Sequence, residues 1–593
     1  MKILGLSFDY HDSAAALIVD GRVVAACQEE RFSRNKHDAS FPHRSIAACL
    51  EFAGLDRKAL DLVAFYEQPL QKFDRIIYGF QQGSARQGAR RFRDTVSDSF
   101  KSWIRQGKFD VRRRIAEGVG IGEDRIRLFG HHQSHAASAF FCSPFNEATV
   151  ITLDGVGEYE TASVSLGRGL SLQPISSVRY PDSIGLFYSA MTAFLGFEVN
   201  EGEYKVMGMA GFGEAAYLDR IQRLIAFSGD GFRLDQRYFS FLMPDDLPFT
   251  PELVALLGPP RQPEAPFFVG DRARPPANAT EAESRHYADI AASVQRVTEE
   301  LILSFVEAAV ARTGVRRVAM AGGVALNSLA NGRLQRELGI DLYVQPAAGD
   351  SGGALGAALQ AFAEATGSRP EPLRSAYLGS RYSREEAQAA LTSAGVDTFT
   401  CFTNTDELLE EAARLLAGGA VIGWMQDRFE WGPRALGARS ILASPLLPDM
   451  QRTINEKIKF REPFRPFAPA VVAERAEEFF DLTPEAGGGQ LRPETFMLSV
   501  CSVRPEARPR IPAVTHVDGT ARVQLVHADS ESRFRKLLEK FGKRTGVPVL
   551  LNTSFNRRGE PIVASPADAI RTFSWSGLDY LIMDDILVRK EFF

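Results

Sequence analysis

Apolar positions at the start of the chain fall into three short runs that are typical of β-strands. Residues 3–8, 14–19 and 22–27 are rich in apolar side chains, and the Asp20-Gly21 pair between the second and third runs is a strong hairpin signal. A polar loop at residues 9–13 separates the first run from the second. The pattern therefore predicts a strand, a polar loop, a strand, a tight turn and a third strand.

Further along, helical spacing and apolar runs predict a mixture of helices and strands. Residues 70–118 have the spacing of a helical insertion, and residues 287–312 that of one long helix. The Pro-rich, polar residues 257–285 between them predict a long loop. Later strands are expected at residues 149–153, 315–320 and 342–345.

Chain length and one linker-like stretch predict more than one domain. At 593 residues the chain is too long for a single hydrophobic core, and two to four domains are expected. The Gly- and Pro-containing residues 367–376 are typical of an inter-domain linker. We therefore expect a first domain at residues 1–366, which contains the helical insertion, and a second domain at residues 375–593.

Composition restricts the environment and the partners. Hydrophobic residues make up 45% of the chain and charged residues 24%, as in ordinary globular proteins. The net charge of -5 gives no reason to expect nucleic-acid binding, and no apolar run is long enough to span a membrane. The five cysteines form no CxxC pair, and the N-terminus lacks the features of a signal peptide. These features predict a cytoplasmic protein with neither nucleic-acid nor membrane partners.

A histidine-rich segment is the strongest candidate for metal chemistry. His131 and His135 are four residues apart, so on a helix they share one face and can bind one divalent ion. His132 stands where a zinc-protease helix would have its glutamate, so the protease interpretation fails. Spacing alone also allows packed histidines without a metal. Asp350, between a predicted strand and a Gly-rich helix start, is the expected third ligand; the role of His132 stays open.

Glycines and basic residues indicate contacts with phosphate. Gly155, Gly322 and Gly323 follow predicted strands, where glycine lets the backbone approach a phosphate closely. In residues 423–440 and 455–469, basic side chains alternate with Phe and Pro without helical or strand periodicity. Rigid neighbours of this kind can hold several cations against anionic oxygens. Nucleic-acid binding is the competing interpretation, and the negative net charge argues against it.

Eleven short stretches carry a family signature along nearly the whole chain. They are FDYHDSAAAL (8–17), EERFSRNKHD (29–38), HHQSHAASAF (131–140), LDGVGE (153–158), GEYKVMG (202–208), AGGVALN (321–327), PAAGDSGGALGAAL (346–359), WGPRALGARS (431–440), NEKIKFREPFRPFAP (455–469), HVDGTAR (516–522) and LNTSFN (551–556). In this order they resemble the O-carbamoyltransferases of the NodU/CmcH/TobZ family.

The resemblance implies both a fold and a two-step reaction. The fold is α/β (α+β): an N-terminal domain similar to TsaD, with the actin/hexokinase/Hsp70-like (ASKHA) fold, and a YrdC-like C-terminal domain. ATP and carbamoyl phosphate would be co-substrates that form carbamoyl adenylate in the C-terminal domain. The carbamoyl group would then pass, in the N-terminal domain, to a hydroxyl of a small-molecule natural product, such as an antibiotic or a Nod-factor-like glycoside.

The resemblance also implies roles for individual residues. His131, His135 and Asp350 would bind the metal, with Fe(II) implied by the family and Mg or Mn also compatible with these ligands. Asp9 and His11 would form a general-base pair, and Lys36 would stabilise developing negative charge. Nucleotide contacts in the N-terminal domain are expected at Asp154, Gly155, Gly322, Gly323 and Asn327. Contacts with carbamoyl phosphate and ATP in the C-terminal domain are expected at Arg434, Lys459, Arg465, Arg522 and Ser554.

Other functions remain as alternatives. A TsaD-like tRNA-modifying carbamoyl or threonylcarbamoyl transferase is the main one, and the acidic charge and the second domain argue against it. An actin-type ATP-binding module would leave the basic second half without a task, and a HypF-like factor would contain CxxC pairs. No motif identifies the acceptor, whose pocket we expect in the insertions at residues 70–118 and 230–285. A homodimer is compatible with the sequence.

Overall fold

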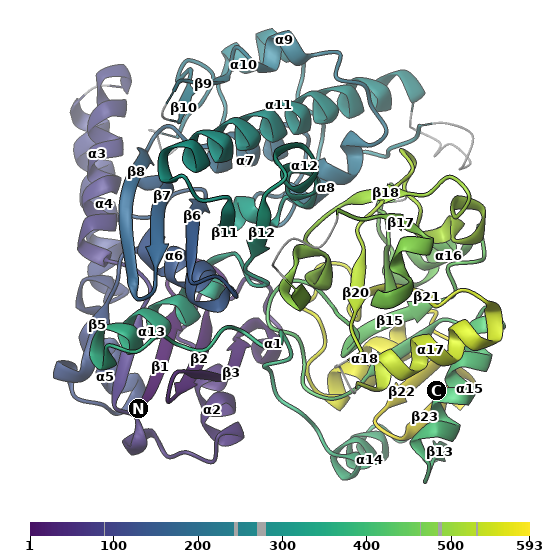
Figure 1. Ribbon diagram of the computed structural model, residues 1–593. Coiled ribbons are helices and arrows are strands. Elements are labelled where there is room, and N and C mark those ends of the chain that lie inside the picture. Colours follow the sequence, from purple (N-terminus) through teal and green to yellow (C-terminus); the bar gives the residue numbers. More distant parts are fainter. Residues whose placement is uncertain are drawn as a thin grey trace. The chain divides into compact units, whose positions relative to one another are not determined.

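The computed structural model describes the chain in two compact units (Figure 1). It describes residues 1–592 except residues 88, 230, 242–246, 270–279, 463, 484–488 and 529–531, with only the backbone for residues 83–87, 89–94, 490 and 592. The first unit comprises residues 1–11, 15–23 and 54–373. The second comprises residues 12–14, 24–53 and 374–593.

Two five-stranded sheets share one strand order. The first has the order β3-β2-β1-β4-β5 and the second β8-β7-β6-β11-β12. In the first sheet β4 runs parallel to β1, and in the second β11 runs parallel to β6. The strands are β1 (Lys2–Ser7), β2 (Ala14–Val19), β3 (Arg22–Gln28), β4 (Leu62–Phe65), β5 (Ile126–Leu128), β6 (Glu147–Leu153), β7 (Glu160–Arg168), β8 (Ser171–Arg179), β11 (Arg317–Ala321) and β12 (Asp341–Val344). This repeated order confirms the α/β, actin-like fold predicted for the N-terminal half.

Glycines bring two helices of the first unit, α6 (His131–Cys142) and α13 (Asp350–Thr366), into close contact (Figure 1). A Cβ atom on Gly356 of α13 would lie 1.8 Å from the carbonyl oxygen of Ser134 in α6. On the other side, a Cβ atom on Gly5 of β1 would lie 1.9 Å from the carbonyl oxygen of Ala354. Only glycine permits such approaches, which place the start of α13 beside the start of α6.

Long helices make up much of the remaining first unit. The predicted insertion consists of α3 (Pro69–Gln87), α4 (Ala89–Arg105) and α5 (Val111–Val119). The predicted long helix is α11 (Glu281–Thr313), which begins six residues earlier than expected because the Thr280 side chain caps it by accepting from the Glu283 backbone N–H. The expected loop at residues 257–285 therefore ends sooner, and its residues 270–279 lie outside the described residues. No described helix is long and apolar enough to cross a bilayer.

The second unit is built on an eight-stranded mixed sheet. Its order is β13-β23-β22-β14-β15-β21-β16-β20, beside a small sheet β17-β18-β19. The large sheet consists of β13 (Thr400–Cys401), β14 (Ile422–Met425), β15 (Arg439–Ala443), β16 (Ala468–Val472), β20 (Gln524–Val526), β21 (Val549–Ser554), β22 (Tyr580–Met583) and β23 (Ile586–Arg589). The small one consists of β17 (Phe480–Asp481), β18 (Cys501–Val503) and β19 (Thr520–Ala521).

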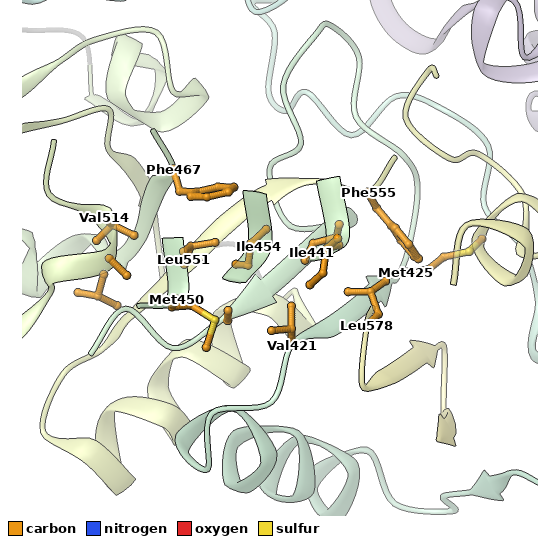
Figure 2. Packing of buried hydrophobic residues seen from close by; sticks show 14 of the residues in the cluster. Val421, Met425, Ile441, Met450, Ile454, Phe467, Val514, Leu551, Phe555 and Leu578 are labelled. Atoms are coloured by element: carbon orange, nitrogen blue, oxygen red, sulfur yellow. The ribbon is translucent and has the colours of Figure 1, made fainter. Parts of the chain in front are cut away.

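Buried clusters lie on both faces of the large sheet. Ile441 and Leu551 belong to one cluster and their neighbours Leu442 and Leu550 to the other, as the alternation of side chains along a strand requires. Figure 2 shows the first cluster, in which Phe555 lies beside Ile441 and near Leu578. Helices α14 (Arg384–Ser393) and α18 (Pro566–Trp575) supply residues to this cluster, and α15 (Thr405–Ala417) and α17 (Arg533–Thr545) supply residues to the other.

An early segment of the chain belongs to the second unit, although it precedes the expected domain boundary. Residues 24–53 contain the short helix α1 (Glu30–Ser33) and α2 (His43–Phe52). The buried Arg31 donates to the carbonyl oxygen of Gly432 at 2.7 Å. Arg34 donates to the carbonyl oxygens of Pro561 and Ile562 at 2.7 and 2.8 Å. The partners in these contacts are hundreds of residues apart in the sequence, so no local pattern predicts them.

Replacing Gly356 by alanine should disrupt the packing of α13 on α6. A methyl group there would overlap the Ser134 carbonyl, and we expect unfolding to need about 3 kcal/mol less free energy, measured as the shift of the urea midpoint. Gly349→Ala is the matched control, because a Cβ atom at Gly349 meets no atom within 4 Å. Equal midpoints for both variants would contradict this explanation.

Candidate functional site

Two histidines and two aspartates converge in the first unit. His131 Nε2 lies 2.8 Å from Asp154 Oδ2 and 3.1 Å from His135 Nε2. His135 Nε2 lies 3.5 Å from Asp154 Oδ2 and 3.7 Å from Asp350 Oδ1. Candidate ligand atoms of all four residues fall within 4.8 Å of one another, and all four residues are buried. The sequence predicted His131, His135 and Asp350 as ligands, and the structure adds Asp154 to the group.

Local interactions hold the two histidines at the start of α6. The carboxylate of Glu158 accepts from the His131 backbone N–H at 3.0 Å and from the Gln68 backbone N–H at 2.7 Å. A carboxylate at this position satisfies an N–H group that has no partner within the helix and interacts favourably with the helix dipole. Sequence reasoning did not assign Glu158 this role, since Gln68 and His131 come from segments far apart in the chain.

Two glycines place Asp154 at the end of β6. Gly323 donates its backbone N–H to Asp154 Oδ1 at 3.0 Å. Gly322 has φ +94°, and a Cβ atom there would lie 2.2 Å from the carbonyl oxygen of Leu153, so this position requires glycine. The predicted strand-end glycines thus support an aspartate through the backbone. The sequence predicted Asp154 as a nucleotide contact beside the metal, because an acidic side chain directly after a buried strand can hold a metal or its water.

The electrostatics of the group suit a divalent cation. Burial alone would lower the pKa of His135, but hydrogen bonds to Asp154 and Asp350 raise it to about 9. Burial alone would raise the pKa of Asp154, but the bonds from His131 and His135 hold it well below its ordinary value. Two imidazoles and two carboxylates are good ligands for several divalent ions. The residues present therefore fit a metal, and they do not select which one.

His132 has a packing role. Its Nδ1 lies 2.5 Å from Thr152 Oγ1, which in turn lies 2.6 Å from Ser163 Oγ. Burial, followed by the neighbouring charge of His131, lowers the pKa of His132 to about 3, so its ring is neutral. A neutral ring bonded to a strand hydroxyl explains why the middle histidine of the segment lies outside the metal-binding group.

Asp9 and His11, expected to form a general-base pair, interact with different residues. Asp9, with φ +82°, receives Arg114 through both carboxylate oxygens, at 2.5 and 2.9 Å. His11 Nδ1 instead lies 3.9 Å from Asp350 Oδ2, and the Tyr66 hydroxyl lies 3.5 Å from the same oxygen. His11 is therefore adjacent to the metal-binding group, whereas Asp9 is engaged by α5. Arg114 lies in the insertion, where no motif marked it.

The remaining nucleotide candidates of the first unit have structural partners. Gly155 accepts from the Ser183 hydroxyl at 2.7 Å. Asn327 caps α12 (Ser328–Leu338), since its Oδ1 accepts from the Ala330 backbone N–H at 3.1 Å. The Asn327 side chain also exchanges hydrogen bonds of 3.0 and 3.2 Å with Gln295. The cap and the amide pair account for Asn327 without a nucleoside.

In the second unit, Lys459 is a buried cation held by oxygen atoms. It ends a π-helical turn, Asn455–Lys459, a form frequent at functional sites. Its ammonium group donates to Asn556 Oδ1 at 2.7 Å, to the Asn556 carbonyl at 3.0 Å and to the Ser554 hydroxyl at 3.2 Å. Burial, and then the charges of Arg461, Arg465 and Lys36, lower the pKa of Lys459 well below its ordinary value.

Arg465, whose charge acts on Lys459, also acts on a second buried cation, Arg522. Burial lowers the pKa of Arg522 well below its ordinary value, and the charges of Arg434 and Arg465 lower it further. Arg522 Nε is buried and has no hydrogen-bond partner among the described residues. We call Lys36, Arg434, Lys459, Arg461, Arg465 and Arg522 the cationic cluster.

The cationic cluster unites residues that the sequence assigned separately. The four basic residues predicted to bind phosphates interact here, and Lys459 contacts Ser554, the fifth residue of that set. Lys36, which was expected at the carbamoyl-transfer site, contributes its charge to this cluster. Burying like charges together is unfavourable unless a ligand of opposite charge compensates for it. The arrangement therefore suits a polyanion such as a phosphate ester.

Comparison with known proteins identifies a family for the chain. Residues 2–359 match the family described as "Carbamoyltransferase N-terminus", and residues 413–590 match "Carbamoyltransferase C-terminus". The chain belongs to this carbamoyltransferase family. The carbamoyltransferase is 42% identical to "Uncharacterized protein sll1178" of Synechocystis sp. over 99% of this chain and 96% of that protein.

Named relatives extend over most of the chain as well. "Nodulation protein NolNO" of Sinorhizobium fredii is 37% identical over 98% of this chain and 79% of that protein. "Nodulation protein U" of Rhizobium tropici is 28% identical over 100% of this chain and 96% of that protein. Among solved structures, component A of an Acidaminococcus fermentans 2-hydroxyglutaryl-CoA dehydratase matches 62% of this chain and 99% of that one at 18% identity, with a TM-score of 0.34. A TM-score this low has no bearing on function.

Metal binding by the carbamoyltransferase should depend on His135 and not on His132. We expect His135→Ala to weaken the binding of Fe(II) or Mn(II) at least about a hundredfold, because a ligand is lost. His132→Gln should leave stoichiometry and affinity within about threefold, since His132 bonds to Thr152 instead. Isothermal titration and elemental analysis of the purified variants measure both. Full metal content in the His135 variant would contradict the ligand assignment.

Phosphate or pyrophosphate should stabilise the carbamoyltransferase through Arg522. At a hundredfold excess over its dissociation constant, a ligand adds about 2.7 kcal/mol to the free energy of unfolding. Arg522→Met removes a buried cation, so we expect that gain to disappear in thermal melts with pyrophosphate, while the ligand-free variant melts no lower than the wild type.

Arg452→Met is the control for this prediction, because Arg452 is exposed and pairs with Asp449 at 3.1 Å on the surface of the same unit. It should retain the whole gain. A gain of the same size in the Arg522 variant would exclude a polyanion site at the cationic cluster.

Proposed function

We propose that this carbamoyltransferase makes carbamoyl adenylate in its second unit and transfers the carbamoyl group to a hydroxyl of a small molecule in its first. Support comes from the presence of two chemically different buried sites, one in each unit. The first is a His and Asp group that fits a divalent cation, and the second is the cationic cluster, which fits phosphate esters.

The cationic cluster has the properties that adenylate formation needs. Carbamoyl phosphate would react with water to give carbamate and phosphate, and a carbamate oxygen would then attack the α-phosphorus of ATP and release pyrophosphate. Negative charge accumulates on phosphate oxygens in both steps. Fixed cations in a buried environment stabilise such charge strongly. Lys459, held by Ser554 and Asn556, is oriented before any substrate binds.

The first unit has the properties that carbamoyl transfer needs. The acceptor hydroxyl must lose a proton as its oxygen attacks the carbamoyl carbon. His11 is a base adjacent to the metal-binding group, with Nδ1 3.9 Å from Asp350 Oδ2. His131, His135, Asp154 and Asp350 would hold the ion. The chemistry that a divalent ion supplies at such a group is neutralisation of charge on the phosphate of the leaving AMP. The products would be the O-carbamoylated acceptor and AMP.

The proposed cofactors and partners follow from these roles. ATP and carbamoyl phosphate are co-substrates, Fe(II) is the preferred ion with Mg and Mn as substitutes, and the acceptor is a hydroxylated natural product. Two relatives are named nodulation proteins, which is compatible with a glycoside acceptor. Nucleic acid is not needed in this scheme, and the work would take place in the cytoplasm.

Single substitutions should separate the two half-reactions. We expect His135→Ala to lower transfer from labelled carbamoyl phosphate to a panel of glycosides at least about a hundredfold, and to leave pyrophosphate release nearly intact. Lys459→Ala should lower pyrophosphate release itself about a hundredfold, because a fixed cation is lost. His132→Gln and Arg452→Met serve as matched controls. Equal loss of both half-reactions in both variants would refute the division, and conversion of ATP to ADP without pyrophosphate would refute the adenylate.

A further inference from the structure

Two large aromatic side chains of the second unit are unusually exposed. The chain has four tryptophans, and Trp103, Trp424 and Trp431 are buried. Trp575, the last residue of α18, is 69% exposed, and Phe460 is 54% exposed. Folding leaves large aromatic side chains in water at a cost, so exposed ones are candidates for binding.

Both aromatic residues belong to segments joined to the turn that carries Lys459. Phe460 directly follows Lys459 and ends the π-helical turn with φ +48°, an unfavourable conformation for a bulky residue. Lys457 in the same turn accepts from the Gly577 backbone N–H at 3.3 Å, two residues after Trp575. The turn that carries Lys459 is therefore attached to the end of α18.

A second connection runs through Arg557. Asn556, which binds Lys459, is followed by Arg557, whose guanidinium carbon lies 5.9 Å from the centre of the Trp575 ring. Phe555 and Leu578, on either side of this connection, belong to one buried cluster, and Figure 2 shows both at the same edge of the core. Arg557 and Trp575 thus lie together on segments joined to the turn that carries Lys459 and Phe460, and we call Phe460, Arg557 and Trp575 the aromatic rim.

We propose that Trp575, with Phe460, stacks on the base of the nucleotide whose phosphates occupy the cationic cluster. A nucleotide has a flat aromatic base joined to a polyanion. The aromatic rim would contact the base, and the cationic cluster would contact the polyanion. Stacking on an aromatic side chain is a general means of holding a base, and a nearby arginine strengthens it. This inference rests on the proposed adenylate formation and adds the residues that would distinguish ATP from carbamoyl phosphate.

The two co-substrates should depend on different residues. Carbamoyl phosphate has a phosphate but no base, so it should depend on the cationic cluster and be indifferent to Trp575. ATP should depend on both. A role of Trp575 in folding alone would affect the two substrates equally.

Tryptophan fluorescence tests the contact directly. Acrylamide should quench Trp575 in the full-length protein, because the other three tryptophans are buried. We expect ATP to protect this fluorescence and carbamoyl phosphate or inorganic phosphate to leave it unchanged. Trp575→Phe should remove the quenchable signal and its response to ATP. Unchanged quenching at an ATP concentration that saturates pyrophosphate release would overturn the proposal.

Steady-state kinetics provide the second measurement. Trp575→Ala should raise the KM for ATP roughly ten- to a hundredfold, which corresponds to the loss of one stacked base, and leave the KM for carbamoyl phosphate unchanged. Trp575→Phe should restore most of the affinity for ATP. Leu447→Ala, at an exposed apolar residue of the same unit, is the control and should change neither constant.

Failure of base stacking and failure of adenylate formation give different results. If the wild type releases no pyrophosphate, the adenylate reaction itself fails. If the wild type releases pyrophosphate and Trp575→Ala leaves the KM for ATP unchanged, or raises both KM values alike, only the stacking proposal fails.

Discussion

The close approach of α13 to α6 and β1 is the contact on which the metal-binding group depends. Asp350 is the first residue of α13, and His131 and His135 are in the first two turns of α6. These side chains meet because Gly356 lies against the Ser134 carbonyl and Gly5 against the Ala354 carbonyl. A side chain at Gly356 would overlap α6, and a side chain at Gly5 would overlap α13, so either would disturb the position of α13. Gly356 of the PAAGDSGGALGAAL stretch is therefore needed for this packing, although it is not itself a candidate ligand.

The two candidate sites handle buried charge in opposite ways. In the first unit, Asp154 and Asp350 lie beside two histidines, so opposite charges compensate one another. The carboxylates raise the pKa of His135, and the histidines lower the pKa of Asp154. In the second unit, Lys459 and Arg522 are buried among other cations, and their neighbours lower both pKa values. In the first group the charges of the protonated histidines and the carboxylates compensate one another without a ligand, and a bound metal ion would replace the protons on the histidines. Within the second group Glu462 pairs with Arg465 at 3.5 Å, and a bound anion would offset the remaining positive charge and stabilise the folded protein.

The sequence predicted the parts of these sites that short motifs encode. Three of the four converging ligands and all the cations expected at phosphates come together, since each lies in a stretch with its own local pattern. Interactions between distant segments were not predictable in this way. Asp9 pairs with Arg114 of α5 rather than with His11, and Arg31 and Arg34 join an early segment to residues more than four hundred positions later. The cap at Thr280 was missed because a Pro-rich neighbourhood obscured it.

Asp9 shows how the insertion influences chemistry that it does not perform. Its carboxylate is held by Arg114, and its carbonyl oxygen accepts from Lys108 at 2.9 Å, so two residues near the end of the insertion fix the loop that carries His11. The Lys72 Nζ atom of α3 lies 4.9 Å from the ring centre of Tyr10, the residue between Asp9 and His11. A base works only when its ring is held at the right distance from the proton it removes. The insertion therefore holds the loop of His11, the proposed base, through Asp9 and Tyr10. Changes in α3 to α5 would shift His11 without changing any residue of the group that could hold a metal.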